Sequence, residues 1–186
     1  GRAFACSVFD LSHAAYANEP LDTTLASAAR FAIEQDVDAL LQVGDAAYNL
    51  LGLLNQSSTN TYVVPNGVSG SPLWINKTSD EILTDLNGMA NAASNATNGI
   101  EYPDKMVLPI AQYDLISQQP RSSTSDTTVK EFFLGNSPTI KEIVPWCPCK
   151  TAGALGVTRA VTYRMDPEAL WVYMPQEFPP KAPQLR

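Results

Sequence analysis

The thiols of Cys147 and Cys149 come closest to a reactive motif in this chain, within the sequence WCPC at residues 146–149. A tryptophan followed by paired cysteines resembles redox dithiol sites, in which an activated thiolate attacks a disulfide. Here a single residue separates the cysteines, whereas an unstrained disulfide needs well-separated Cα atoms with suitable side-chain directions. A zinc site that recruited Cys6 and His13 would have to gather distant parts of the chain. The sequence therefore predicts no redox centre, metal site or cofactor.

Other candidates for catalysis are equally isolated. His13 is the only histidine, so any serine or cysteine nucleophile with a histidine base would have to use it. It falls in an amphipathic stretch, FACSVFDLSHAAYANE, where a structural helix residue is the simpler interpretation. Gly44 and Asp45 would suit the start of a phosphate loop, but neither a Gly-x-Gly-x-x-Gly nor a Gly-Lys-Ser/Thr sequence accompanies them. We predict no catalytic residue and no enzymatic activity.

Composition and charge restrict the class of protein further. The chain has 186 residues, of which 45% are hydrophobic and 17% charged, which is enough to bury a core in one or two small domains. A formal net charge of -7 argues against a dedicated nucleic-acid binder, which normally carries a basic patch. No apolar run approaches the roughly 20 residues that span a bilayer. The pattern is that of a globular protein without a membrane segment.

One long helix dominates the N-terminal half. Pro20 suits a first helical turn, and Gly44 suits the left-handed position that ends a helix. Between them, acidic residues lie off an apolar stripe that recurs at three- and four-residue steps. The spacing predicts a helix over 21–43, on the order of 35 Å long, with its core face formed by Leu21, Leu25, Ala29, Ile33, Val37 and Leu40.

The remaining pattern alternates helices and strands. Residues 56–76 predict an irregular connection with a short strand at TYVVP, and Thr78 with Glu81 forms a capping box for a helix over 79–95. A further helix is expected to begin at Asp126 or Thr127 and end at Gly135. The other expected elements are strands over 105–109, 140–146, 157–164 and 169–174, a short helix over 111–117, and a turn at Asp166 and Pro167.

Several blocks of sequence carry a family resemblance. The run PLDTTLASAARFAIEQDVDALLQVGDAAYNLLGLLN resembles the spine helix and following turn of tailed-bacteriophage major capsid proteins with the Hong Kong 97-type fold. Three further blocks are similar to consecutive parts of the same family, in the same order: TSDEILTDLNGMANAASNATNGIEYPDKMVLPIAQYDLI, SDTTVKEFFLGNSPTIKEIVPW and YRMDPEALWVYMPQEFPPKAPQLR. Together the blocks cover most of the chain.

The resemblance implies an α+β fold in which residues 1–77 contribute the spine helix and its connection to a peripheral domain. Residues 78–165 would form an axial domain, and residues 166–186 would return toward the peripheral domain. In that family, strands from outside the spine region cover its apolar stripe. We therefore expect that these residues are an incomplete portion of a larger product.

The function implied by the resemblance is structural. Copies of the subunit would assemble into pentamers and hexamers of an icosahedral shell, in the host cytoplasm, and would enclose DNA without reading its sequence. Portal, scaffold or decoration proteins would be further partners, and the product would reside in the virion. Candidate subunit-interface residues are Arg121, Trp146, Cys147 and Cys149. Because function rests on interface area, no cofactor is expected.

Two alternatives remain open from the sequence. An encapsulin-type compartment shares the fold, and an operon that carries a cargo enzyme would distinguish it from a virus. A soluble enzyme of another class would need a convergent polar site, for which this chain offers one histidine and scattered carboxylates.

Overall fold

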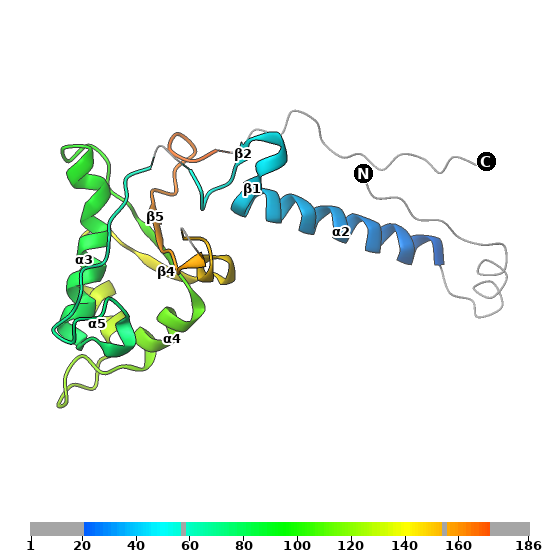
Figure 1. The fold of residues 1–186 in the computed structure, drawn as a ribbon. Helices are drawn as coiled ribbons and strands as arrows, with labels where there is room; N and C mark the ends of the chain where they lie inside the picture. The colour runs from blue at the N-terminus through cyan, green and yellow to red at the C-terminus, as the bar shows by residue number, and fades with distance from the viewer. Residues whose placement is uncertain (1–20, 57–58, 154–155, 172–186) are drawn as a thin grey trace. The chain divides into compact units, whose positions relative to one another are not determined.

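The computed structural model describes residues 21–56, 59–153 and 156–171. They form two compact units (Figure 1). Of the described residues, the first unit contains 21–56, 59, 146–153 and 156–159, and the second contains 60–145 and 160–171. The sequence placed the division at residues 77 and 78 and assigned 146–159 to the later domain. The assignment of peripheral and axial domains stays a prediction.

The first unit is built around the long helix α2, Leu21–Val43, whose bounds agree with the expectation from sequence (Figure 1). A short hairpin follows, in which β1 (Gly44–Asp45) pairs antiparallel with β2 (Leu50–Leu51). The 3₁₀ turn η1 (Ala46–Tyr48) connects the two strands. Within η1, the Asp45 carboxylate accepts a hydrogen bond from the Ala47 amide, at 2.9 Å.

Gly44 ends α2 with a left-handed backbone, φ 77°, as predicted. The chain then turns back so closely that a Cβ at Gly44 would lie 2.1 Å from the Leu50 carbonyl oxygen. A Cβ at Gly52 would lie 2.6 Å from the carbonyl group of Gln42. This approach lets the turn donate to the last carbonyl groups of α2, through Leu53 N to Leu41 O (2.9 Å), Leu54 N to Gln42 O (3.0 Å) and Asn55 Nδ2 to Val43 O (2.6 Å).

The second unit holds a three-stranded sheet in the order β4-β3-β5. The central strand β3 (Lys105–Leu108) runs parallel to β4 (Glu142–Pro145) and antiparallel to β5 (Val161–Tyr163). Lys105 lies opposite Glu142 on one side and opposite Tyr163 on the other. The helices are α3 (Ser79–Ala96), α4 (Ile110–Gln118) and α5 (Val129–Asn136), with the 3₁₀ turn η2 (Trp74–Asn76) before α3.

The core of the second unit joins these helices to the sheet. Apolar residues of α3 recur at helical spacing and are buried, as the stripe in the sequence predicted. The Thr78 and Glu81 capping box is also confirmed, because each side chain bonds the backbone N–H of the other residue. The buried core comprises Trp74, Ile82, Leu83, Leu86, Met89, Ala90, Met106, Leu108, Ile116, Val129, Phe133, Ile140 and Ile143.

Two boundaries differ from the expectation. Helix α5 is capped by Thr128 rather than by Asp126 or Thr127, because Thr128 and Glu131 form a second capping box. The helix also passes Gly135 and ends at Asn136. The Thr-x-x-Glu sequence from Thr128 to Glu131 is the local signal that marks the start of α5.

Several expected strands are shorter or absent. TYVVP at residues 61–65 forms no strand, and the Pro65 carbonyl accepts a hydrogen bond from a side chain instead of a neighbouring strand. Only Val161–Tyr163 of the expected strand over 157–164 pairs with β3. The amides of Ala169 and Leu170 donate to the Asp166 carbonyl, which confirms the turn. Residues 169–171 form no strand, and residues 172–174 lie outside the described part. An apolar sequence pattern can occur anywhere in a chain, but a strand forms only where a second strand is present to pair with it.

Candidate functional site

The described residues hold no group of three or more histidine, cysteine or acidic side chains that would bind a metal ion. Cys147 is exposed and Cys149 is buried, and both are free thiols. Burial raises the pKa of the Cys149 thiol to about 11, so this group stays protonated at neutral pH. Cys6 and His13 lie outside the described residues. The described helices also include none that is long and apolar enough to cross a membrane.

Cys149 anchors the returning segment of the first unit. It lies in the 3₁₀ turn η3 (Cys147–Lys150), and its carbonyl accepts a hydrogen bond from the Arg159 amide at 2.9 Å. The Arg159 guanidinium in turn donates to the carbonyl of Leu54, whose side chain is buried. Cys149 is fully buried within the single chain. Its role at a subunit interface stays a prediction.

The side chains of Trp146 and Cys147 differ in their exposure to solvent. Trp146 is half-buried and precedes η3 as its N-cap residue. Cys147 is exposed. Their role at an interface stays a prediction.

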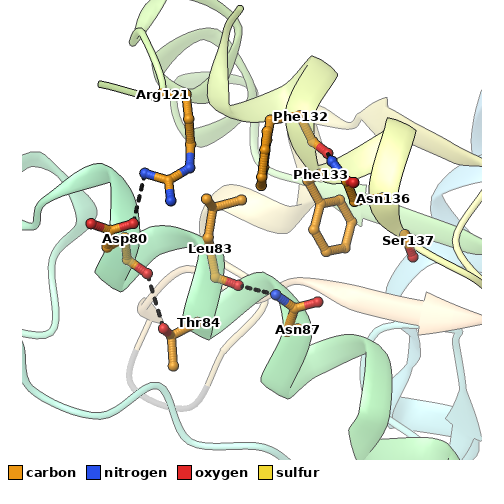
Figure 2. Close-up of a pocket in the computed structure, with 9 residues that line it drawn as sticks. All are labelled: Asp80, Leu83, Thr84, Asn87, Arg121, Phe132, Phe133, Asn136 and Ser137. Atoms are coloured by element: carbon orange, nitrogen blue, oxygen red, sulfur yellow. Dashed lines mark hydrogen bonds and ion pairs between the residues drawn. The ribbon is translucent and has the colours of Figure 1, made fainter. Parts of the chain in front are cut away.

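Arg121 lies in a loop of the second unit and lines an open groove of about 300 Å³ between α3 and α5 (Figure 2). Its Nη1 atom lies 2.6 Å from the Asp80 carboxylate, and its guanidinium stacks 5.0 Å from the centroid of the Phe132 ring. Its amide donates to the Thr127 carbonyl at 2.9 Å. Arg121 therefore holds its own loop against the groove, and an interface role stays a prediction.

The chemistry of the groove is that of a packing surface. Leu83, Phe132 and Phe133 supply its apolar lining (Figure 2). Two polar side chains beside them bond within α3: Thr84 Oγ1 donates to Asp80 O at 2.9 Å, and Asn87 Nδ2 donates to Leu83 O at 2.8 Å. With Asp80 paired to Arg121, no nucleophile and base converge there.

A buried charge cluster in the second unit was not foreseen from the sequence. Lys77 Nζ lies 2.6 Å from Asp85 Oδ2, and Trp74 Nε1 donates to the same oxygen at 2.9 Å. Lys77 also donates to the Pro65 carbonyl at 2.7 Å. Burial, and then the charge of Asp85, raises the pKa of Tyr62. The available signal was Asp85 itself, a charge set among the apolar positions of α3.

The Glu81 carboxylate, in α3, binds backbone amides of the loop that precedes this helix. One carboxylate oxygen accepts from the Val68 amide at 2.6 Å, and the other accepts from the Thr78 amide at 2.8 Å. These backbone donors, Thr78 first and then Val68, lower the pKa of Glu81. The loop before α3 is thus held by hydrogen bonds to the helix.

None of the predicted core residues of α2 whose side chains are described is fully buried. Ala29, Ile33 and Val37 are half-buried, whereas Leu40 is 39% exposed. The side chains of Leu21 and Leu25 lie outside the described part. The helix is confirmed, and the assignment of its stripe to a buried core stays a prediction.

Comparisons with known proteins find a family and a solved structure that match this chain. A family model described as major capsid protein matches residues 1–185. Among solved structures, a chain of the capsid of Myoviridae phage XM1 shares the fold with a TM-score of 0.69 at 19% sequence identity. The match covers 86% of this chain and 53% of that chain, so this chain spans about half the length of the phage XM1 protein. No curated protein matches. On the family match over nearly its full length, the chain belongs to the major capsid protein family.

Proposed function

We propose that this chain is part of the subunit that forms the head shell of a tailed phage or related virus. Copies assemble into pentamers and hexamers of an icosahedral shell in the host cytoplasm and remain in the virion. The single observation that carries the proposal is the family match over residues 1–185. Closed rings are the natural product of a repeated head-to-tail contact whose rotation closes.

The charge and chemistry of the chain support a structural role. The net charge of -7 suits a wall that encloses DNA without gripping it. The groove at Arg121 and the described thiols offer no catalytic arrangement. Portal, scaffold and decoration proteins complete the proposed set of partners. Function then resides in the interfaces between subunits, without catalysis or a cofactor.

Production of the complete gene product, followed by electron microscopy and sedimentation, tests the proposal. We expect hollow shells, with free rings of five and six subunits after mild dissociation. Purified subunits should not shift a DNA duplex in a gel at physiological salt, because a binder would need a basic surface. A product that stays a monodisperse monomer at high concentration would contradict the proposal.

A further inference from the structure

Three asparagines of this chain, Asn66, Asn87 and Asn98, are exposed and are each followed by glycine. This dipeptide is prone to spontaneous deamidation, because glycine has no side chain to obstruct its backbone nitrogen. The glycine nitrogen bonds to the asparagine Cγ, and the side-chain nitrogen leaves as ammonia with the proton of the glycine N–H. Water then opens the cyclic imide to aspartate or isoaspartate. A hydrogen bond that occupies the glycine N–H therefore opposes the reaction.

Two of the three pairs are held by α3 itself. Gly88 lies in the interior of this helix, where its N–H belongs to the helical hydrogen-bond ladder. Asn98 follows the end of the helix with a left-handed backbone, φ 52°, and the Gly99 amide donates to the Ser94 carbonyl at 2.7 Å. These two pairs are released only when turns of α3 open.

Asn66 lies outside the helices, in the loop that leads into α3. The Gly67 amide donates to the Ser71 carbonyl at 3.0 Å, and the Gly70 amide donates to the Gly67 carbonyl at 2.8 Å. The bond that occupies the glycine N–H therefore closes a short turn within the loop. Hydrogen bonds of exposed loops open at a lower free energy than those of helix interiors. By itself, this turn would protect Asn66 less than α3 protects the other two asparagines.

Two charged side chains fix the loop on either side of Asn66. Before it, the buried Lys77 ammonium donates to the Pro65 carbonyl at 2.7 Å. After it, the Val68 amide donates to a carboxylate oxygen of Glu81 at 2.6 Å. Hydrogen bonds to ionised groups are about twice as strong as neutral ones. Because both neighbours of the Asn–Gly pair are fixed in this way, the turn has little freedom to open.

Gly67 also packs closely against both charged side chains. A Cβ at Gly67 would lie 3.0 Å from Glu81 Oε1 and 3.0 Å from Lys77 Cγ. The backbone at this position therefore lies directly on the side chains that fix the loop. Formation of the cyclic imide requires this backbone to rotate, and the close contact opposes the rotation.

We propose that Asn66 is a conditional deamidation site, which stays closed while the Glu81 carboxylate binds the Val68 amide and opens when this bond is lost. The product is aspartate or isoaspartate at this position, with water as the co-reactant. Glu81 is a positioning residue, since it acts through the loop rather than on the reacting atoms. The inference goes beyond the proposed function and does not rest on it, because it depends on the fold of the second unit.

Variants of the complete gene product at Glu81 and Glu131 test this role. The two glutamates are matched, because each closes the capping box of its own helix. The proteins are incubated in mildly alkaline buffer, and peptide mass spectrometry measures aspartate and isoaspartate at the Asn–Gly pairs. We expect Glu81→Ala to raise the rate at Asn66 at least about fivefold and to change the rate at Asn98 less than about twofold. Glu131→Ala should change neither rate.

The unmodified protein supplies two further measurements. In urea, Asn66, Asn87 and Asn98 should react at similar rates, and in the folded protein each should react at least about tenfold more slowly. Hydrogen exchange of the peptide over residues 66–71 gives a readout without deamidation. Its amides should be protected in the unmodified protein and in Glu131→Ala, and should exchange faster in Glu81→Ala.

Equal rates at Asn66 in the folded unmodified protein and in urea would overturn the inference. Equal effects of Glu81→Ala and Glu131→Ala at Asn66 would also overturn it. An equal rise at Asn98 in folded Glu81→Ala would show that the whole of α3 has loosened, which is a third outcome against it.

If circular dichroism shows that Glu81→Ala has lost its fold, Glu81→Gln decides. A glutamine can close a capping box, but it binds the Val68 amide without charge. Glu81→Gln should raise the rate at Asn66 at least about twofold while the rate at Asn98 stays unchanged. No rise at Asn66 in this variant would overturn the inference.

Discussion

The Lys77 ammonium and the Asp85 carboxylate form a 2.6 Å ion pair inside the second unit, where both side chains are almost fully buried. Two further hydrogen bonds tie the preceding segments to this pair. The Trp74 indole donates to Asp85 of α3, and the Lys77 ammonium donates to the Pro65 carbonyl. A buried pair of this kind adds little net stability over an apolar substitute, but removal of one partner leaves an uncompensated charge. The pair therefore defines the position of the loop before α3.

The first prediction follows from this pair. Asp85→Ala should lower the free energy of unfolding by about 3–5 kcal/mol, because Lys77 stays buried without its counter-charge. The double variant Lys77→Met, Asp85→Leu should recover most of that loss. Urea denaturation of the complete product measures both. A double variant no more stable than Asp85→Ala would show that the charges themselves are required.

The second prediction concerns the end of α2. Gly44→Ala should lower the free energy of unfolding by about 1–3 kcal/mol, because a Cβ at φ 77° would also meet the Leu50 carbonyl. Gly135 is the matched control, since it lies in α5 with no atom within 4 Å of its ideal Cβ position. Gly135→Ala should be neutral or stabilising by up to about 1 kcal/mol. Equal effects in thermal unfolding would refute the close approach.

The third prediction uses the thiols. Iodoacetamide should modify Cys147 in the folded protein at neutral pH and leave Cys149 unmodified until denaturant is added. The pKa of Cys149 rises from an ordinary value of 9.0 to about 11 on burial. The folded state therefore favours the protonated thiol, so this contribution to stability is complete below pH 9 and lost as pH rises through about 11.

Cys149→Ala isolates that pH dependence from the titration of other groups. Between pH 9 and pH 11, the unmodified protein should lose more stability than Cys149→Ala. Parallel curves for the two proteins would mean that the thiol is not desolvated in solution.

The fourth prediction concerns the stripe of α2. Ile33→Asp should abolish soluble assembly. An isolated buried charge costs several kcal/mol, which is a large part of the typical free energy of unfolding of about 5–15 kcal/mol. Glu34 is the adjacent control: it is exposed and pairs with Arg30 at 2.9 Å along the same helix. Glu34→Ala should cost less than about 1 kcal/mol. Soluble shells from Ile33→Asp, seen by electron microscopy, would show that the stripe stays uncovered in the assembly.

Features set by neighbours along the chain were predictable from the sequence. The periodic stripe and Gly44 defined the bounds of α2, and the Thr78 and Glu81 capping box defined the start of α3. Helical spacing and end signals act within a few residues, so they can be read locally. The blocks of family-like sequence also predicted the α+β fold and membership of the capsid family.

Tertiary structure decided the features that depend on distant partners. TYVVP and residues 169–171 have strand-like composition but no strand beside them, since a strand needs a neighbour for its hydrogen bonds. Cys149 was expected at a subunit interface and is buried in its own chain, in a segment that Arg159 ties to Leu54 through hydrogen bonds to the carbonyls of Cys149 and Leu54. The exposure of Val68 depends on its bond to Glu81, and the position of the whole loop depends on the burial of Lys77 against Asp85. Such contacts join residues far apart in the chain, and their geometry exists only after the fold has brought them together.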